Sequence, residues 1–209
     1  KLLMILGIKR GDSGRLLAHH DHNAAPRRPQ IMERIKSGGS VALVSDAGTP
    51  LVSDPGYKLV AACVEEGVAV TAVPGPSAPL MALTLSGLPT DRFFFQGFLP
   101  AKGAARRTAL AEISAVPATL IFMESGPRLA ASLADMAQVL GPRPAAVARE
   151  LTKKFEEVRR GTLDDLAAHY AEAGPPRGEI CVVTGPPGAE AQATAADIDA
   201  LLTEALAKG

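Results

Sequence analysis

The sequence predicts an α/β fold made of two domains. Short apolar runs of the length typical of strands alternate with helical patterns of about ten to fifteen residues along the chain. A turn-forming stretch at 88–91 separates two such series. With 209 residues, 47% of them hydrophobic and 21% charged, the chain has the size and composition of one large or two small globular domains.

Short apolar segments with the pattern of buried strands occur along both halves of the chain. They are 13–20, 40–45, 68–73, 92–98, 118–124, 145–150 and 179–184. A helical pattern with a readable start or end lies between most of them. This alternation is the basis of the predicted α/β class.

The helices predicted in the first half have clear ends. Asp54 is a suitable N-cap, Pro55 suits the first helical position, and Gly67 closes the helix. Ser77 caps the next helix, which runs toward Ser86. These ends place each helix directly after a predicted strand and loop.

In the second half, Ser125 caps a helix that ends at Gly141, and Thr162 with Asp165 resembles a capping box. The segment after 185 is linker-like and leads into one more helical face. We expect domains at 1–90 and 91–188, followed by a linker and the start of a small helical segment at 189–209. Because the sequence opens within a helical pattern, we also expect the first strand of the N-terminal domain to be missing.

Composition limits the classes of partner. Lys plus Arg equals Asp plus Glu, so a formal net charge of zero gives no global reason to expect nucleic acid or an anionic membrane. Cys63 and Cys181 each lie in an apolar run, which indicates core thiols of a cytoplasmic protein. No signal peptide is visible, and prolines interrupt the longest uncharged run, 68–90, so we expect no membrane helix.

Several common catalytic motifs are absent from the sequence: GxGxxG, the P-loop, HExxH, CxxC and GxSxG. The cluster HHDHN at 19–23 is the one metal-like group. On a strand, His20 and His22 point the same way and Asp21 the other way. Since no third ligand is visible, we expect no metal and a polar, substrate-facing strand end, with a metal site as the alternative.

Three loops of small residues follow predicted strands. They are SDAGTP at 45–50, PGPSAP at 74–79 and ESGPR at 124–128. Ligands of open α/β sheets bind outside the carboxyl ends of the strands, and helix N-termini offer free N–H groups. The loops therefore suit a small ligand that carries a carboxylate, a ribose and an adenine. The other interpretation, that they are only turns and caps, stays open on this pattern alone.

Long motifs in order along the chain resemble a known family. They are LLAHHDHN, SDAGTPLVSDPG, VPGPSA, GLPTDRFFFQGFLPAK, IFMESGPRL, ARELTKKFEE with RRGTL, and GEICVV, from about Leu16 to Val183. They are similar to the ribosomal RNA small subunit methyltransferase I family, which belongs to the tetrapyrrole methylase superfamily. The resemblance implies 2'-O-ribose methylation of a cytidine near the decoding site of 16S rRNA, in the small ribosomal subunit. It also implies two α/β domains with S-adenosylmethionine in the cleft between them, and a homodimer.

The resemblance implies a set of cofactor contacts in both domains. They are Ser45, Asp46, Ala47, Gly48 and Thr49 in the first loop, Ser77 and Ala78 in the second, and Met123, Ala148, Arg149 and Ile180 in the second domain. Candidates for the base that takes the hydroxyl proton are the carboxylates Glu124, Glu150 and Asp46. Candidates for contacts with the substrate are His20, His22, Asp54, Lys102, Arg106, Arg128 and Lys153.

The sequence departs from the family at both ends. The family begins with a strand, a glycine-containing loop and an acidic segment, and none of these is among the 209 residues. It also continues into a small helical domain, of which only the first helix is visible. Two alternatives stay open here: a tetrapyrrole C-methyltransferase, whose loop usually reads GDP, and a non-catalytic nucleotide- or RNA-binding relative.

Overall fold

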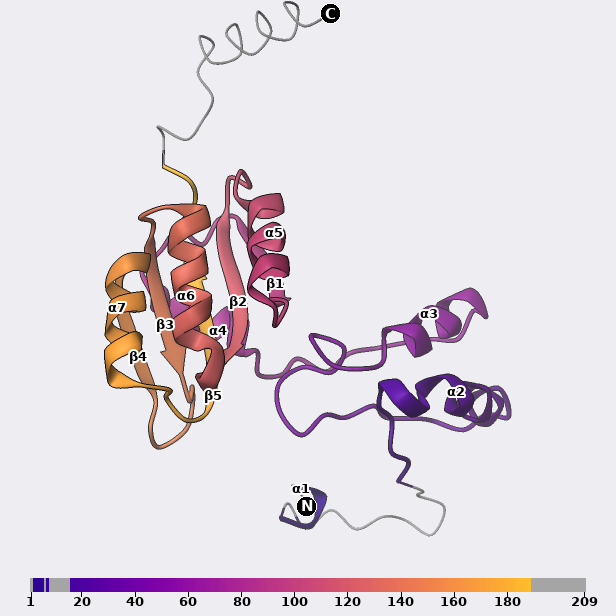
Figure 1. Cartoon of the computed structure of the whole chain (residues 1–209). Helices are drawn as coiled ribbons and strands as arrows, with labels where there is room; N and C mark the ends of the chain where they lie inside the picture. The colour runs from indigo at the N-terminus through magenta and orange to yellow at the C-terminus, as the bar shows by residue number, and fades with distance from the viewer. Residues whose placement is uncertain (1, 6, 8–15, 189–209) are drawn as a thin grey trace, which may run out of the picture. The chain divides into compact units, whose positions relative to one another are not determined.

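The structure is a computed structural model that describes residues 2–5, 7 and 16–188. The chain divides after Ser77 into two compact units, and each is described by itself. Figure 1 labels the helices and strands in chain order. The predicted domain division at residue 90 stays a prediction, although helix α4 (Ala78–Ser86) packs on the sheet of the second unit.

The first unit is built around two helices. Its elements are α1 (Leu2–Ile5), α2 (Asp21–Lys36) and α3 (Tyr57–Glu65). Buried Ile31 and Met32 of α2 pack against Leu59 and Cys63 of α3 to form a small core. No β-strand occurs among the described residues of this unit.

The strands predicted at 40–45 and 68–73 do not form in the structure. Among the described residues, no backbone hydrogen bond joins 40–45 and 69–73 to each other or to a third segment. A strand exists only through such a ladder, so an apolar pattern alone is insufficient. Val68 is half-buried, and the other valines of these segments are exposed, from 42% for Val41 to 87% for Val73.

The N-terminus of α2 replaces the strand end predicted around 19–23. His20 is the N-cap of this helix, and the His20 backbone N–H donates to Oδ1 of Asn23 at 2.8 Å. The helix continues through Pro26 and Pro29, which made a helix a poor expectation from sequence. The part of the predicted strand 13–20 before residue 16 lies outside the described residues.

Helix α3 begins two residues later than predicted. Its N-cap is Gly56 rather than Asp54, and Gly56 has a φ of 139°. A Cβ at this position would lie 2.6 Å from Cδ2 of Leu43, so the chain needs glycine here for both conformation and space. The predicted closure at Gly67, with a φ of 67°, is confirmed.

The second unit contains one five-stranded sheet. Its strands are β1 (Phe93–Phe98), β2 (Thr119–Ser125), β3 (Pro144–Arg149), β4 (Glu157–Thr162) and β5 (Glu179–Thr184), in the spatial order β1-β2-β5-β3-β4. β1 and β2 are parallel, and the other neighbours are antiparallel. It follows that β1, β2 and β3 all end at the same edge of the sheet. We call this the carboxyl edge.

Helices cover both faces of this sheet (Figure 1). They are α5 (Gly103–Ile113), α6 (Gly126–Leu140) and α7 (Leu163–Ala173) on one face and α4 on the other. The larger core includes Leu110 of α5, Leu133 of α6 and Leu166 of α7 against Phe122 and Val182 of the sheet. The smaller core packs Ala82 and Leu83 of α4 against Ile121, Cys181 and Val183.

Four strands predicted for the second half are confirmed to within one residue at each end. The caps at Ser125 and Thr162 are also confirmed, and Thr162 Oγ1 accepts from the Asp165 backbone N–H at 3.1 Å. Strand β4 was not predicted, because EVRRGT is polar and forms a half-exposed edge strand. No helix within 2–5 or 16–188 is long and apolar enough to cross a bilayer.

Candidate functional site

The loop 45–50 is fixed by its own polar groups. Ser45 Oγ donates to the carbonyl of Ala47 at 2.7 Å. Gly48 has a φ of 68°, and no heavy atom lies within 4 Å of the position where its Cβ would be. This open space lets a ligand approach the backbone closely.

A side-chain bond joins two of the predicted cofactor loops. Thr49 Oγ1 donates to the carbonyl of Pro76 at 2.9 Å, across 27 residues of sequence. The predicted segments 45–50 and 74–77 of the first unit therefore lie together. Ser77 ends this unit and Ala78 opens α4, so the predicted helix start after Ser77 is confirmed.

Asp46 places a carboxylate on the loop 45–50. The residue is exposed, and no hydrogen bond or ion pair engages its side chain within the described part of the chain. Asp54 is half-buried and equally unengaged among those residues. Of the three carboxylates predicted as proton acceptors, Asp46 is the one whose oxygens are available to a ligand.

In the second unit, three predicted cofactor contacts lie near one row of the sheet. Met123 of β2 and Ala148 of β3 both pair with Cys181 of β5, which lies between them. Their side chains are on the α4 face, whereas Ile180 is buried in the core on the opposite face. A contact at Ile180 is therefore limited to its backbone. Cys181 is itself part of the core on the α4 face, as strand alternation from Val183 requires.

Glu124 is a buried carboxylate with its oxygens already engaged. Oε1 accepts from the Ser125 backbone N–H at 2.8 Å, and Oε2 accepts from Ser132 Oγ at 2.5 Å. Only 1% of the side chain is exposed. This carboxylate stabilises the start of α6, so the structure gives it a packing role rather than an open position for a base.

Arg128, in the first turn of α6, binds the loop that follows β1. Its Nη2 donates to the carbonyl of Leu99 at 2.5 Å. Its Nε lies 3.3 Å from Oε1 of Glu124, an ion pair whose angle does not make a hydrogen bond. Because the guanidinium is engaged on both sides, Arg128 is poorly placed for the substrate contact predicted from sequence.

Glu150 forms a cluster with two neighbours at the carboxyl edge. Its Oε1 accepts from Lys153 Nζ at 2.9 Å and from the Glu179 backbone N–H at 3.1 Å. These bonds, the one from Lys153 first, hold the pKa of Glu150 below its ordinary value. The same pair, with the Glu179 carboxylate as second partner, raises the pKa of Lys153. Both predicted site residues are thus used in holding the loop after β3.

Arg149 is also engaged by the protein. Its Nη2 lies 2.9 Å from Oε2 of Glu157 on the neighbouring strand, and its Nη1 donates to the carbonyl of Arg177 at 3.2 Å. Hydrogen bonding by Arg149 lowers the pKa of Glu157. A cofactor contact here is restricted to the backbone of Arg149.

The basic residues at the start of α5 have two different environments. Arg106 is 6% exposed, and its Nε and Nη2 each lie 2.6 Å from Oδ2 of Asp135 on α6. Arg107 binds the other oxygen of Asp135 at 3.0 Å. Arg106 is therefore part of the core and is not presented to a phosphate, whereas Lys102 is exposed at the N-cap of α5.

The histidine cluster no longer has the predicted geometry. His20 caps α2, and His22 lies within the first turn, so the two side chains do not project together from a strand. The side chain of His22 is outside what the structure describes. Within the described residues, no group of three His, Cys, Asp or Glu could hold a metal ion.

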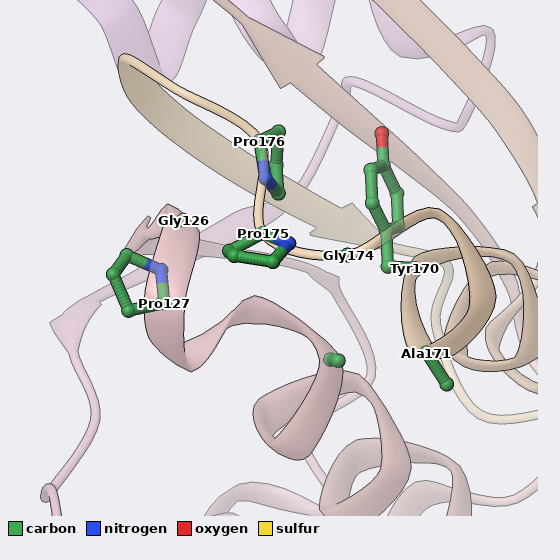
Figure 2. A pocket seen from close by; sticks show the side chains of 8 residues that line it. Gly126, Pro127, Tyr170, Ala171, Gly174, Pro175 and Pro176 are labelled. Carbon is green, nitrogen blue, oxygen red and sulfur yellow. The ribbon is translucent and has the colours of Figure 1, made fainter.

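A cavity of about 260 Å³ lies at the start of α6 (Figure 2). Its lining consists of Gly126, Pro127, Ala130, Tyr170, Ala171, Gly174, Pro175 and Pro176. The Tyr170 hydroxyl has no hydrogen-bond partner in the described chain, but Figure 2 shows it directed away from Pro127. The cavity lies beside the predicted loop 124–128 and includes no other predicted site residue.

Similarity to known proteins extends over most of the chain. The sequence model of the family described as Tetrapyrrole (Corrin/Porphyrin) Methylases matches residues 8–167. The chain belongs to this family. In the solved structure of a cobalt precorrin-4 methyltransferase, 78% of the chain superimposes on 87% of ours with a TM-score of 0.60. At 15% identity this likeness concerns the fold alone, and it confirms the predicted tetrapyrrole methylase fold.

Curated relatives define the branch of this tetrapyrrole methylase. A Mesorhizobium japonicum protein is 56% identical over 96% of our chain, and a Micromonospora olivasterospora protein is 51% identical over 93%. Both are named ribosomal RNA small subunit methyltransferase I, which confirms the resemblance seen in the motifs. The chain spans 67% and 62% of their respective lengths. Family membership confirms the predicted methyltransferase class and S-adenosylmethionine as the methyl donor.

The buried thiol of this methylase gives a pH-dependent prediction. Burial raises the pKa of Cys181 from 9.0 to about 11. The folded protein therefore holds this proton while the unfolded chain loses it, so stability is complete below pH 9 and declines as the pH rises toward 11. Two pKa units correspond to about 3 kcal/mol.

We expect urea unfolding between pH 8 and 11 to show a steeper loss of stability for the wild type than for Cys181→Ala, by about 2 kcal/mol over this range, because the full effect is reached only above the folded pKa. The constant cost of the smaller side chain cancels in this comparison of slopes. Parallel pH profiles for the two proteins would show that the Cys181 thiol ionises as easily in the folded state as in the unfolded chain.

Proposed function

We propose that this protein methylates the ribose 2'-oxygen of a cytidine in the decoding region of 16S rRNA, with S-adenosylmethionine as donor. The observation that carries the proposal is the pair of relatives at 56% and 51% identity that are named ribosomal RNA small subunit methyltransferase I. By the same proposal, its partner is the small ribosomal subunit, its compartment is the cytoplasm, and it acts as a homodimer.

The residues of the first unit fit the proposed cofactor. The exposed backbone of 46–48 offers peptide groups to a ligand, and the bond from Thr49 to Pro76 holds 45–50 against 74–77. The open space at Gly48 admits a bulky group close to the chain. In the second unit, we propose contacts from Met123 on the α4 face of the sheet, and from the buried Ala148 and Ile180 through their backbones.

S-adenosylmethionine supplies a methyl group on a positively charged sulfur. The protein has to hold the ribose 2'-oxygen in line with that carbon and to exclude water. The new bond joins oxygen to carbon, the carbon–sulfur bond breaks, and the hydroxyl proton passes to a base. We propose Asp46 for that role, because no residue in the described part of the chain engages its carboxylate, while those of Glu124 and Glu150 are engaged.

The experiment that tests the function is methyl transfer by the full-length protein. Labelled S-adenosylmethionine is incubated with small ribosomal subunits that lack the modification, and the product nucleotide is mapped by mass spectrometry. A single 2'-O-methylcytidine near the decoding site supports the proposal. If subunits and naked 16S rRNA both stay unlabelled while the cofactor binds, the ribosomal substrate is wrong.

The same assay tests the base. We expect Asp46→Asn to lower kcat by about 10²- to 10⁴-fold with little change in the Kd of S-adenosylmethionine, because an amide cannot accept the proton. Glu65→Gln removes an exposed carboxylate from the same unit and is expected to leave kcat unchanged. A loss of cofactor binding together with transfer in Asp46→Asn would assign Asp46 to binding instead.

A further inference from the structure

The loop 150–156 between β3 and β4 has a constrained backbone. It leaves the sheet at the carboxyl edge, the edge at which β1 and β2 also end. Glu150 and Thr152 have φ values of 51° and 65°, in the left-handed region that side chains with a Cβ rarely adopt. Such strain persists only where surrounding contacts enforce it, and it concentrates at binding sites.

Contacts within the loop supply that enforcement. The Thr152 backbone N–H donates to Oε2 of Glu156 at 2.6 Å, and the Lys153 backbone N–H donates to the carbonyl of Glu150 at 3.0 Å. Lys153 Nζ lies between the carboxylates of Glu150 and Glu179, at 2.9 and 3.1 Å. The loop is therefore closed on itself, and the carboxylates of Glu150 and Glu156 are used inside it.

The closed loop presents an aromatic ring and a cation to solvent. Phe155 is 63% exposed, although its apolar ring gains nothing from water there. Lys154 Nζ lies 5.5 Å from the centre of this ring. Among the described residues, no carboxylate pairs with Lys154. The loop thus holds one face of a ring and one positive charge in a fixed relation.

We propose that Phe155 and Lys154 form a stacking platform for an unpaired base of the RNA substrate. The proposal rests on the proposed function and adds a contact to it. Proteins that bind single-stranded RNA stack bases on exposed rings and neutralise the adjoining phosphates with cations. A second copy of the chain fits the platform less well, because symmetric pairing would bring two Lys154 charges together.

The test measures binding of the full-length protein to small ribosomal subunits that lack the modification. We expect Phe155→Leu to weaken this binding by about 5- to 150-fold, because loss of stacking on one base has an effect of this size. Phe155→Tyr keeps an aromatic face and should stay within about threefold of the wild type. Lys154→Gln should lower the slope of log affinity against log salt by about 0.7.

The matched control is Phe93→Leu, the same substitution at a ring that is 45% exposed on β1, the opposite edge strand of the sheet. It should leave RNA binding unchanged, and binding of S-adenosylmethionine should persist in every variant.

Equal binding by Phe155→Leu and the wild type, or equal losses in Phe155→Tyr and Phe155→Leu, would overturn the platform. A changed oligomer mass with unchanged RNA affinity would assign Phe155 to contact between copies. If the wild type itself does not bind subunits, the proposed function fails first and the platform with it.

Discussion

Gly126→Ala is expected to lower the free energy of unfolding by about 3 kcal/mol or more. Gly126 is the first residue of α6, and a Cβ there would lie 1.8 Å from the carbonyl oxygen of Pro176 and 3.0 Å from its carbon. Both are backbone atoms of a segment that contains Pro175 and Pro176, so no side chain can rotate away. The start of the helix or the segment before β5 has to move. Urea unfolding, followed by circular dichroism, measures the loss.

Gly103→Ala is the matched control, because Gly103 is also the first residue of a helix, α5. A Cβ there would meet the far ends of side chains, the nearest being Arg107 Nη1 at 3.3 Å. We expect a change within about 1 kcal/mol, since alanine is the better helix former. If both variants are equally stable, the close approach of Pro176 to α6 is wrong.

Strands and helix starts were predicted correctly from the sequence where the local pattern and the tertiary packing agree. The strands at 92–98 and 179–184 are apolar runs that become β1 and β5, and Ser125 and Thr162 lie where the helices begin. Each of these elements has its partner strands or packing helix in the same unit. The pattern and the hydrogen-bond ladder therefore point to the same structure.

The local apolar pattern led to wrong predictions where pairing with another segment decides whether a strand forms. The valine-rich segments 40–45 and 68–73 read as strands, yet no neighbouring strand pairs with them in the structure. Strand β4 reads as polar and forms because it pairs with β3. Helix α2, which passes through Pro26 and Pro29, was not among the predicted helices. The strand errors share one cause, since pairing with residues distant in sequence decides whether a strand forms.

In the candidate site, too, some features follow from the local sequence and others depend on contacts between distant residues. The motif SDAGTP predicts a ligand loop, whereas its connection to 74–77 through Thr49 rests on a single hydrogen bond that no sequence spacing reveals. For charged residues, the sequence does not show which opposite charge lies nearby. Glu124, Arg128 and Lys153, which were predicted as site residues, form hydrogen bonds or ion pairs within the protein, and their roles stay predictions.

Arg106 provides the second prediction with a large effect. Its side chain is 7% exposed and that of Asp135 is 11% exposed, with 2.6 Å between Nη2 and Oδ2. Asp135→Ala leaves a buried guanidinium without its partner, and we expect it to cost about 3–5 kcal/mol of unfolding free energy. Asp164→Ala, at an exposed position on α7, should change stability by less than about 1 kcal/mol.

The double variant Arg106→Met/Asp135→Leu distinguishes a structural ion pair from a phosphate contact. Replacing both buried charges with apolar side chains of similar volume removes the unpaired charge, so most of the stability lost in Asp135→Ala should return. If Arg106 acts only inside the protein, this variant should bind unmodified small subunits as tightly as the wild type and with the same salt dependence. A salt slope reduced by about 0.7 in a stable double variant would show that Arg106 contacts RNA phosphate after all. Because stability and salt slope are separate measurements, a misfolded variant cannot be mistaken for a lost contact.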